Sequence, residues 1–588
     1  MEYISQKQEV FMKRIIALAL AALFVFATFT GCAKRDEDDK GAVIPIYVTD
    51  EIRSYDPIPM IYEAETVLNT GILFEGLTYI DDNGKVQKGV AKEWYTKINE
   101  ERGEYFLFFK LEAETGWDDR RTVQADDFVY AWRRVLSPET NSPAACLLYN
   151  IRNAKELKSG LVTADDLGVY AESATLLKVE FNGPFDLDLF LETVASPALV
   201  PQREDLVSGR EDSWASSADN FAANGALTLK GFEPGKGVTF QRNTSYNRDP
   251  ESDTVEWKVV KPYQFPVDFT QSEEERLEAW ENKLMFYISS LSKEAYEQYD
   301  RKIKTDDLLS SYTYFFNTTK APFDNAKVRL ALSMALDREE IAEIQGMGTK
   351  PATGFVTYGV HDAKASKSFR KVGGELYDTE AQMDEAKALI KEAGINPSDY
   401  TITITTTRDT ADIEISEYVE TVWEELGFKV ELSDERTMLF QEALYKGNFD
   451  VIGLDYQGLT TDAFSFLAPF ARAYSGSVID ISLEDETTKP HVTGFDNEAY
   501  NELIDKAANE LNMKERAKLL HQAEEMLAEE CPAIALTFNV TNYMKSGKLK
   551  NVDSSIFGYK IFTKAKLSGY QDVKAELEAI EEAAKAAK

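Results

Sequence analysis

The sequence predicts an α/β fold in which part of the β-sheet is parallel. In the segment 401–432, Ile402 and Ile404 alternate with threonines, residues with helical spacing run from Ile413 to Leu426, and a second strand-like stretch follows. Strand, helix and strand in this order form a βαβ unit with parallel strands. The chain of 588 residues is 44% hydrophobic, with 28 Tyr and 33 Phe, which is enough apolar surface for a large core.

Elements nearer the amino terminus are predicted from alternation and turn residues. Val43 to Val48 alternates like an opening strand. Leu77 to Ile80 is a second strand-like stretch, and Asp81-Asp82-Asn83-Gly84 after it is typical of a hairpin turn, because Asn-Gly supports positive φ angles. The acidic turn lacks the further ligands and the closing Glu of a calcium loop.

Helices are predicted in the carboxy-terminal half. One runs from Met383 to Ala393 and ends at Gly394, which serves as a left-handed cap. Another is predicted over 498–529, and the tail 571–588, rich in Ala, Glu and Lys, is predicted to be a solvated helix or a frayed end. The apolar face of the helix over 498–529 is formed by Leu503, Ile504, Ala507, Leu511, Leu519, Leu520, Met526 and Leu527.

The amino-terminal segment predicts export. The basic pair Lys13 and Arg14 precedes a short apolar run from Ile15 to Phe29, which is typical of a signal peptide over residues 1–31. Met12 stands directly before the basic pair, so translation could start at Met1 or at Met12.

A cysteine ends this segment. Phe29-Thr30-Gly31-Cys32 resembles the bacterial lipobox, and a polar stretch follows it at once, as expected of a membrane tether over 32–42. We therefore predict that Cys32 carries a lipid anchor on the outer face of the cytoplasmic membrane. The other two cysteines, Cys146 and Cys531, are predicted to be buried thiols, and the sequence leaves open whether they pair.

The charge and the motifs limit the classes of function. A net charge of −36 disfavours binding to nucleic acid, since the cationic surface that phosphates require is missing, and it suits a monomer. No nucleophile elbow, phosphate loop or metal-binding spacing occurs around His361, His491 or His521. The sequence therefore predicts that the protein is not an enzyme and needs no cofactor. His521 is predicted to be structural, and His491 is predicted to lie in a polar loop.

Several blocks of residues stand out along the chain. They are Ser54-Tyr55-Asp56-Pro57, Leu73-Phe74-Glu75-Gly76-Leu77, Gly89-Val90-Ala91-Lys92-Glu93-Trp94, Ala125 to Arg134 with Asp166-Leu167-Gly168-Val169, and Lys320 to Asn325 with the residues through Arg338. These blocks resemble the oligopeptide-binding proteins of ATP-binding-cassette importers, extracellular solute-binding protein family 5, and occur in the order of that family over almost the whole mature chain.

The resemblance implies a two-lobed periplasmic-binding-protein type II fold with an extra inserted domain. Two crossover strands join the lobes, which close around the ligand by a hinge motion. The implied organisation is a signal peptide (1–31), a tether (32–42), the first lobe in three segments (43–76, 196–311 and 540–570), the inserted domain (77–195), the second lobe (312–539) and a tail (571–588).

The resemblance also implies a function. The protein would capture oligopeptides outside the cytoplasm and deliver them to the permease subunits of an ATP-binding-cassette importer. Relatives on the same fold carry nickel chelates, haem or sugars or sense signalling peptides, and these cargoes remain alternatives. An adhesin or an enzyme on the same scaffold is a further alternative from another class.

One loop departs from the pattern of the family. There, a Gly-Trp-x-Ala-Asp sequence supplies the aspartate that pairs with the α-ammonium of the ligand. In this chain Tyr456 stands at the position of the Trp and Leu459 at that of the anchoring Asp. We therefore expect a displaced anchor, with Asp455, Asp462 and Glu63 as candidates, although Asp462 could instead cap the next helix. Tyr62, Tyr456, Phe538 and Asn539 complete the predicted ligand-binding residues.

Overall fold

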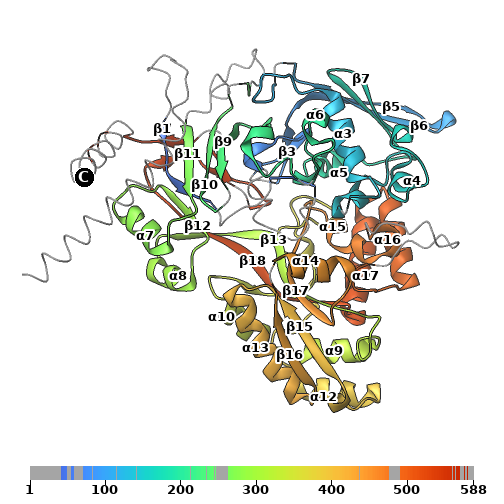
Figure 1. Cartoon of the computed structure of the whole chain (residues 1–588). Helices are drawn as coiled ribbons and strands as arrows, with labels where there is room; N and C mark the ends of the chain where they lie inside the picture. The colour runs from blue at the N-terminus through green and yellow to red at the C-terminus, as the bar shows by residue number, and fades with distance from the viewer. Residues whose placement is uncertain are drawn as a thin grey trace, which may run out of the picture.

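Two lobes, one above the other in Figure 1, make up the chain. The first lobe and the inserted domain form the upper part, and the second lobe forms the lower part. The structure is a computed structural model. It describes residues 42–48, 55–58, 71–81, 84–246, 262–475, 491–569, 575 and 579, apart from 114, 141, 212, 234, 244, 436, 559, 563 and 564.

The first lobe contains a four-stranded sheet. Its order is β1-β11-β10-β9, and the first pair, from distant parts of the chain, is parallel. The predicted single strand over 43–48 is wrong: the chain forms β1 and then β2, which pairs with β12 in another sheet. Pro45 lies between them and has no N–H to continue a ladder. The bounds are β1 Ala42–Val43, β2 Ile46–Tyr47, β9 Leu227–Glu233, β10 Gly237–Arg242 and β11 Pro262–Asp268.

The inserted domain contains an antiparallel sheet in the order β5-β6-β8-β7, against which α3 packs. The hairpin predicted near 77–86 is confirmed, because β3 and β4 pair antiparallel and Gly84 has a φ of 73°. The bounds are β3 Thr78–Ile80, β4 Val86–Lys88, β5 Ala91–Asn99, β6 Glu104–Leu111, α3 Ala125–Val135, α4 Ala154–Lys158, β7 Val169–Ser173, β8 Leu176–Glu180 and α5 Leu187–Thr193.

An ion pair joins two of the sequence blocks. Arg134, at the end of α3, donates to both oxygens of Asp56 over 2.8 and 2.6 Å, and the indole of Trp214 donates to Asp56 over 2.9 Å. The side chains of Arg134 and Asp56 are 11% and 5% exposed, so the pair holds the inserted domain on the first lobe from within the protein. These blocks therefore specify packing of the fold.

The largest sheet is an eight-stranded mixed sheet with the order β16-β15-β17-β13-β18-β12-β2, and β14 pairs with β18 beside this row. β2 and β12, at one end of the row, lie in the predicted first lobe, and the opposite end lies in the predicted second lobe. β13 and β18 are long and pass through the predicted lobe boundaries at 311/312 and 539/540, which stay predictions. The bounds are β12 Tyr287–Ser289, β13 Ile303–Phe316, β14 Lys350–Pro351, β15 Thr401–Thr406, β16 Lys429–Asp434, β17 Val451–Gln457 and β18 Ala533–Lys545.

The predicted βαβ unit is confirmed as β15, α13 and β16, with the two strands parallel. α13 begins at Thr410, three residues before the predicted start, because Asp409 caps it by accepting from the N–H of Ala411. The predicted helix Met383–Ala393 and its cap Gly394 are also confirmed. α7 Glu273–Glu281 and α8 Lys293–Tyr299 lie in the predicted first lobe. The helices of the predicted second lobe include α9 Ala326–Met334, α10 Arg338–Gln345, α12 Met383–Ala393, α13 Thr410–Glu425 and α14 Thr437–Lys446.

The helix predicted over 498–529 is two helices, α16 (Glu498–Asn509) and α17 (Met513–Glu530). Asn512 interrupts it, because its side chain accepts from the N–H groups of Lys514 and Glu515 and so caps the second helix. Leu511 falls in the break and is 45% exposed, so its assignment to the apolar face was wrong.

Both faces of the large sheet are covered, and the strand residues alternate between them. Along β17, Val451 packs toward α13, whereas Ile452, Leu454 and Tyr456 pack toward α15 to α17. α15 spans Phe464–Leu467. None of the helices in the described residues is long and apolar enough to cross a membrane. The tail prediction for 571–588 lies outside the described residues, apart from Ala575 and Ala579.

Candidate ligand-binding site

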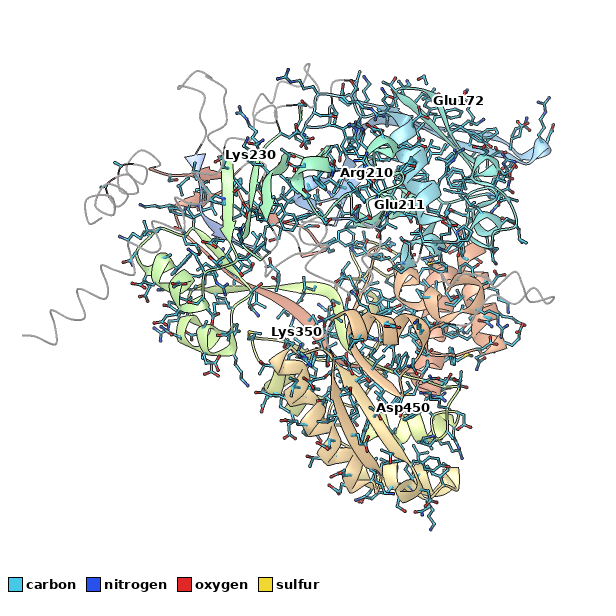
Figure 2. The ribbon with its side chains drawn as sticks, in the orientation of Figure 1. Glu172, Arg210, Glu211, Lys230, Lys350 and Asp450 are labelled. Carbon is cyan, nitrogen blue, oxygen red and sulfur yellow. The ribbon has the colours of Figure 1, made fainter. Side chains whose placement is uncertain are left out.

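The predicted site residues of the second lobe lie at the carboxyl end of β17. Asp450 precedes this strand and lies below Lys350 in Figure 2, whereas Lys350, whose strand pairs with β18 at Phe538, lies nearer the first lobe. β17 therefore runs toward the first lobe. In α/β sheets ligands bind beyond the carboxyl ends of the strands, so this end is the expected position of a ligand.

Asp455 lies on the face of the sheet that α13 covers. It pairs across the ladder with Tyr312 of β13, and its Oδ1 accepts from the side-chain amide of Asn539 over 2.6 Å. Burial raises the pKa of Asp455 to about 6, and the amide lowers it only partly. Among the described residues, no lysine or arginine forms an ion pair with this carboxylate. Asp455 thus remains available for a cationic partner.

Tyr456 faces the opposite side of the sheet from Asp455. Its ring is 4% exposed among Phe315, Phe355 and Phe470, and its hydroxyl donates to the carbonyl oxygen of Phe466 over 2.9 Å. The described contacts of Tyr456 are therefore packing contacts, and its role in ligand binding stays a prediction.

Leu459, at the position of the missing anchor, is buried together with residues of the upper part of the molecule. It thus makes an apolar contact between the lobes in place of a charge.

Asp462 has a partner within the protein. Arg516 donates to both of its oxygens over 2.8 and 2.6 Å, and the arginine side chain is 5% exposed. The alternative that Asp462 caps the next helix is wrong, since no side chain caps α15. The ion pair favours a structural role for Asp462 over that of a free anchor.

Phe538 and Asn539 lie side by side on β18. Phe538 is 3% exposed and meets the ring of Tyr358 edge-on at 5.3 Å. Asn539 donates to Ser310 as well as to Asp455, so it links β13 and β17 at the end of the sheet nearer the first lobe. Cys32, Tyr62 and Glu63, the other predicted site residues, lie outside the described residues.

Contacts between the inserted domain and the second lobe were not expected from the sequence. Glu192 of α5 lies 3.8 Å from the Nδ1 of His361, and a Cβ at Gly84 would come within 3.2 Å of the same imidazole. Burial and the charge of Asp462 raise the pKa of Glu192 to about 8, although Arg516 opposes this, and burial lowers the pKa of His361. The two parts of the molecule thus meet in a desolvated interface.

The remaining histidines and cysteines occupy structural positions. His521 stacks on Phe369 and its Nε2 lies 2.8 Å from Asp362, as expected of a structural residue. His491 is not in a polar loop: it is 4% exposed and stacks on Phe470, and burial lowers its pKa to about 3. Cys146 and Cys531 are buried free thiols, so they do not pair.

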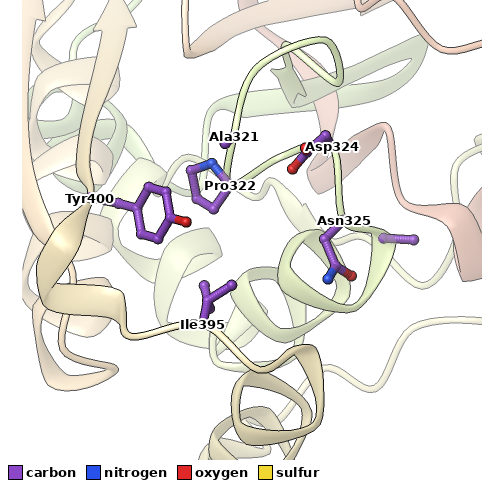
Figure 3. Close-up of a pocket in the computed structure, with 7 residues that line it drawn as sticks. Ala321, Pro322, Asp324, Asn325, Ile395 and Tyr400 are labelled. Atoms are coloured by element: carbon purple, nitrogen blue, oxygen red, sulfur yellow. The ribbon is translucent and has the colours of Figure 1, made fainter.

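A hollow of about 490 Å³ lies in the second lobe between Ala321–Ala326 and the pair Ile395 and Tyr400 (Figure 3). Tyr400 directly precedes β15, so the hollow lies at the amino end of that strand, opposite the end where a ligand is expected. Among the described residues, no group of three or more His, Cys, Asp or Glu side chains is placed to hold a metal ion.

Comparison with known proteins agrees with this architecture. The periplasmic murein peptide-binding protein MppA of Escherichia coli (strain K12) is 30% identical over 508 residues, which cover 84% of this chain and 87% of MppA. The dipeptide-binding protein DppE of Bacillus subtilis (strain 168) is 26% identical over 567 residues, which cover 93% and 98%.

Two structures of MppA differ in how well they match. One has a TM-score of 0.73 at 25% identity, and the unliganded open form has 0.58 at 26% identity, each over 90% of this chain and 98% of MppA. The structure of this chain is therefore more similar to the first of these structures than to the unliganded open form. The profile of the bacterial extracellular solute-binding proteins, family 5 Middle, matches residues 85–477. The chain belongs to the bacterial extracellular solute-binding proteins of family 5.

Proposed function

We propose that this protein captures oligopeptides outside the cytoplasm and delivers them to the permease of an ATP-binding-cassette importer. The observation that carries the proposal is the contact of the inserted domain with the second lobe, together with a polar end of the central sheet, in a family whose similar members bind a murein peptide and dipeptides. The protein acts as a receptor and not as an enzyme.

The ligand lies extended between the lobes, where its main chain bonds to backbone and to Asn or Asp side chains. Asp455 pairs with the α-ammonium in place of the aspartate that Leu459 replaces. Tyr62, Glu63, Tyr456, Phe538 and Asn539 are further ligand contacts in this proposal, and Asp462 supports the site through Arg516.

Identification of the bound ligand tests the proposal. Native mass spectrometry of the protein purified from its own host should reveal peptide masses, and small-angle scattering should show a smaller radius of gyration when a peptide is added to the emptied protein. Recovery of a nickel chelate, a haem or a sugar, with no binding of any peptide, would overturn the peptide cargo. The loss of the usual anchor at Leu459 is the feature that favours such an alternative cargo.

A lipid anchor at Cys32 holds the protein, as a monomer, on the outer face of the cytoplasmic membrane. The apolar run before Cys32 and the polar tether after it support this location. Replacement of Cys32 by alanine should release the protein into the medium or the periplasm. If the Cys32→Ala protein fractionates with membranes as fully as the wild type, the anchor is elsewhere.

A further inference from the structure

The face of the central sheet that α13 covers changes character along its length. Deep in the second lobe it presents Tyr314, Phe316 and Ile534 to the core. Nearer the first lobe it becomes polar, because Tyr312 pairs with Asp455 on one side and with Thr537 on the other. Residues paired across a ladder share a face, so a polar row stands here where the sheet leaves the core.

A second carboxylate approaches this row from the helix. Asp412 lies in the first turn of α13, where it accepts from the hydroxyl of Thr407. Burial first, and the charge of Asp412 second, raise the pKa of Tyr312. Burial first and the charge of Asp455 second raise the pKa of Asp412 to about 7, with a further contribution from Asp409. Asp412 and Asp455 are thus close enough for the charge of one to oppose ionisation of the other.

The cluster has more acceptors than donors. The Nδ2 of Asn539 donates to Ser310 over 3.0 Å and to Asp455 over 2.6 Å, and its Oδ1 is buried with no hydrogen-bond partner. Asn539 is only 9% exposed, so water does not readily satisfy this oxygen. The hydroxyl of Tyr312, a residue that is 2% exposed, lies near Asp412 but makes no hydrogen bond of normal geometry, so this donor satisfies the carboxylate only in part. Among the described residues, no basic side chain forms an ion pair with Asp409, Asp412 or Asp455.

The two carboxylates are partly buried. Asp412 and Asp455 both keep part of their surface accessible, yet desolvation is the main cause of the raised pKa of each. A group on an open face would be hydrated and would not shift in this way. Asp455 lies on the part of the sheet nearer the first lobe, so a ligand held between the lobes would approach the carboxylates from there.

We propose that Asp412, Asp455 and the Oδ1 of Asn539 form a subsite that binds a protonated amine of the ligand. An ammonium group has three N–H donors and no acceptor, which complements two carboxylates and an unpaired amide oxygen. A hard metal ion would need more oxygen ligands than this cluster offers. The subsite rests on the proposed function for the rest of the ligand, and it adds Asp412 and a chemical preference: either the amino terminus or a lysine side chain fills it.

Four probes separate these sources in titration calorimetry: Ala-Ala-Ala, N-acetyl-Ala-Ala-Ala, N-acetyl-Ala-Lys-Ala and the diamine cadaverine. Asp412→Asn and Asp455→Asn should each weaken amine-bearing probes by about 10- to 100-fold, as expected for loss of a charged hydrogen bond, and leave the probe without an amine nearly unchanged. Asp384→Asn is the matched control, because Asp384 also lies in the first turn of a helix but is exposed on α12.

The pattern of losses separates the possible results. A loss confined to Ala-Ala-Ala assigns the subsite to the amino terminus, and a loss confined to N-acetyl-Ala-Lys-Ala assigns it to a side chain. Equal losses for the probes with and without an amine, or unchanged affinities in both variants, overturn the subsite. Binding of cadaverine that depends on Asp412, with no binding of any peptide, keeps the subsite and overturns the peptide cargo instead. Binding of neither peptides nor cadaverine overturns both.

Discussion

Replacing Glu192 by glutamine should reduce the pH dependence of lobe closure. In the structure the pKa of Glu192 is raised to about 8, and the charges that act on it, Asp462 and Arg516, belong to the second lobe, as does the neighbouring His361. When the lobes separate, Glu192 loses these neighbours and gains water, so its pKa should return to about 4.3. The closed form therefore binds one more proton than the open form between these two pH values.

The sign and the size of the effect follow from this difference. A group with a raised pKa in the closed form opposes closure increasingly as the pH rises through that interval, since its charged form must then be buried. From pH 5 to pH 8 the difference amounts to at most about 4 kcal/mol, at about 1.4 kcal/mol per pH unit. The Glu192 side chain keeps 20% of its exposure, which reduces the effect below this limit.

Small-angle scattering of the ligand-free protein at pH 5, 6.5 and 8 measures the effect. The radius of gyration of the wild type should grow with pH, and that of the Glu192→Gln protein should grow less. Glu172→Gln is the control, because Glu172 lies in the same inserted domain but its side chain is 45% exposed. If the Glu192→Gln and Glu172→Gln proteins expand to the same extent as the wild type, burial of Glu192 does not govern closure.

Three further changes test the interior of the second lobe. Glu524→Gln should lower the free energy of unfolding by about 3–5 kcal/mol in urea titrations, because Glu524 is fully buried and its Oε1 accepts from Arg370, Phe355 and Val356; a loss under 1 kcal/mol would contradict a buried ion pair. Asp462→Asn should cost a similar amount and leave Arg516 without its partner, whereas the exposed Asp434→Asn should be nearly neutral. Asp412→Asn should raise the free energy of unfolding of the ligand-free protein by about 1–3 kcal/mol at pH 8 and by less at pH 5. The reason is that the pKa of Asp412 is raised to about 7, so ionisation of this group costs the folded state more as the pH rises. If thermal unfolding shows no gain in stability at pH 8, Asp412 is not a desolvated carboxylate.

Local patterns were enough to predict several elements. The alternation in β15, the helical spacing of α13 and the glycine that ends α12 all act within a few residues, and the structure confirms them. The ends of helices were harder to predict where a polar side chain caps a helix within a continuous apolar pattern. Asn512 is such a case, since its capping bonds end one apolar pattern and start another.

Contacts between distant residues could not be predicted in the same way. Asp462 was a candidate ligand contact from its position in a loop, but its partner Arg516 lies 54 residues further on. Nothing near Glu192 in the sequence indicates that the second lobe covers it. Only part of the acceptor-rich cluster was predicted from the sequence: Asp455 was a candidate, but Asp412 was not. Asp412 joins the cluster through the packing of α13 on the sheet, and that packing depends on the whole lobe.

The two long strands β13 and β18 have a mechanical consequence. Their hydrogen-bond ladder is interrupted between Asp307 and Ser311, so the paired ribbon has a short soft stretch where it passes from one lobe to the other. Two hydrogen-bonded strands bend more easily out of the plane of their ladder than within it, and they resist sliding past each other and stretching. The lobes should therefore rotate about a single hinge axis, and the angle between the closed lobes should depend on the size of the bound ligand.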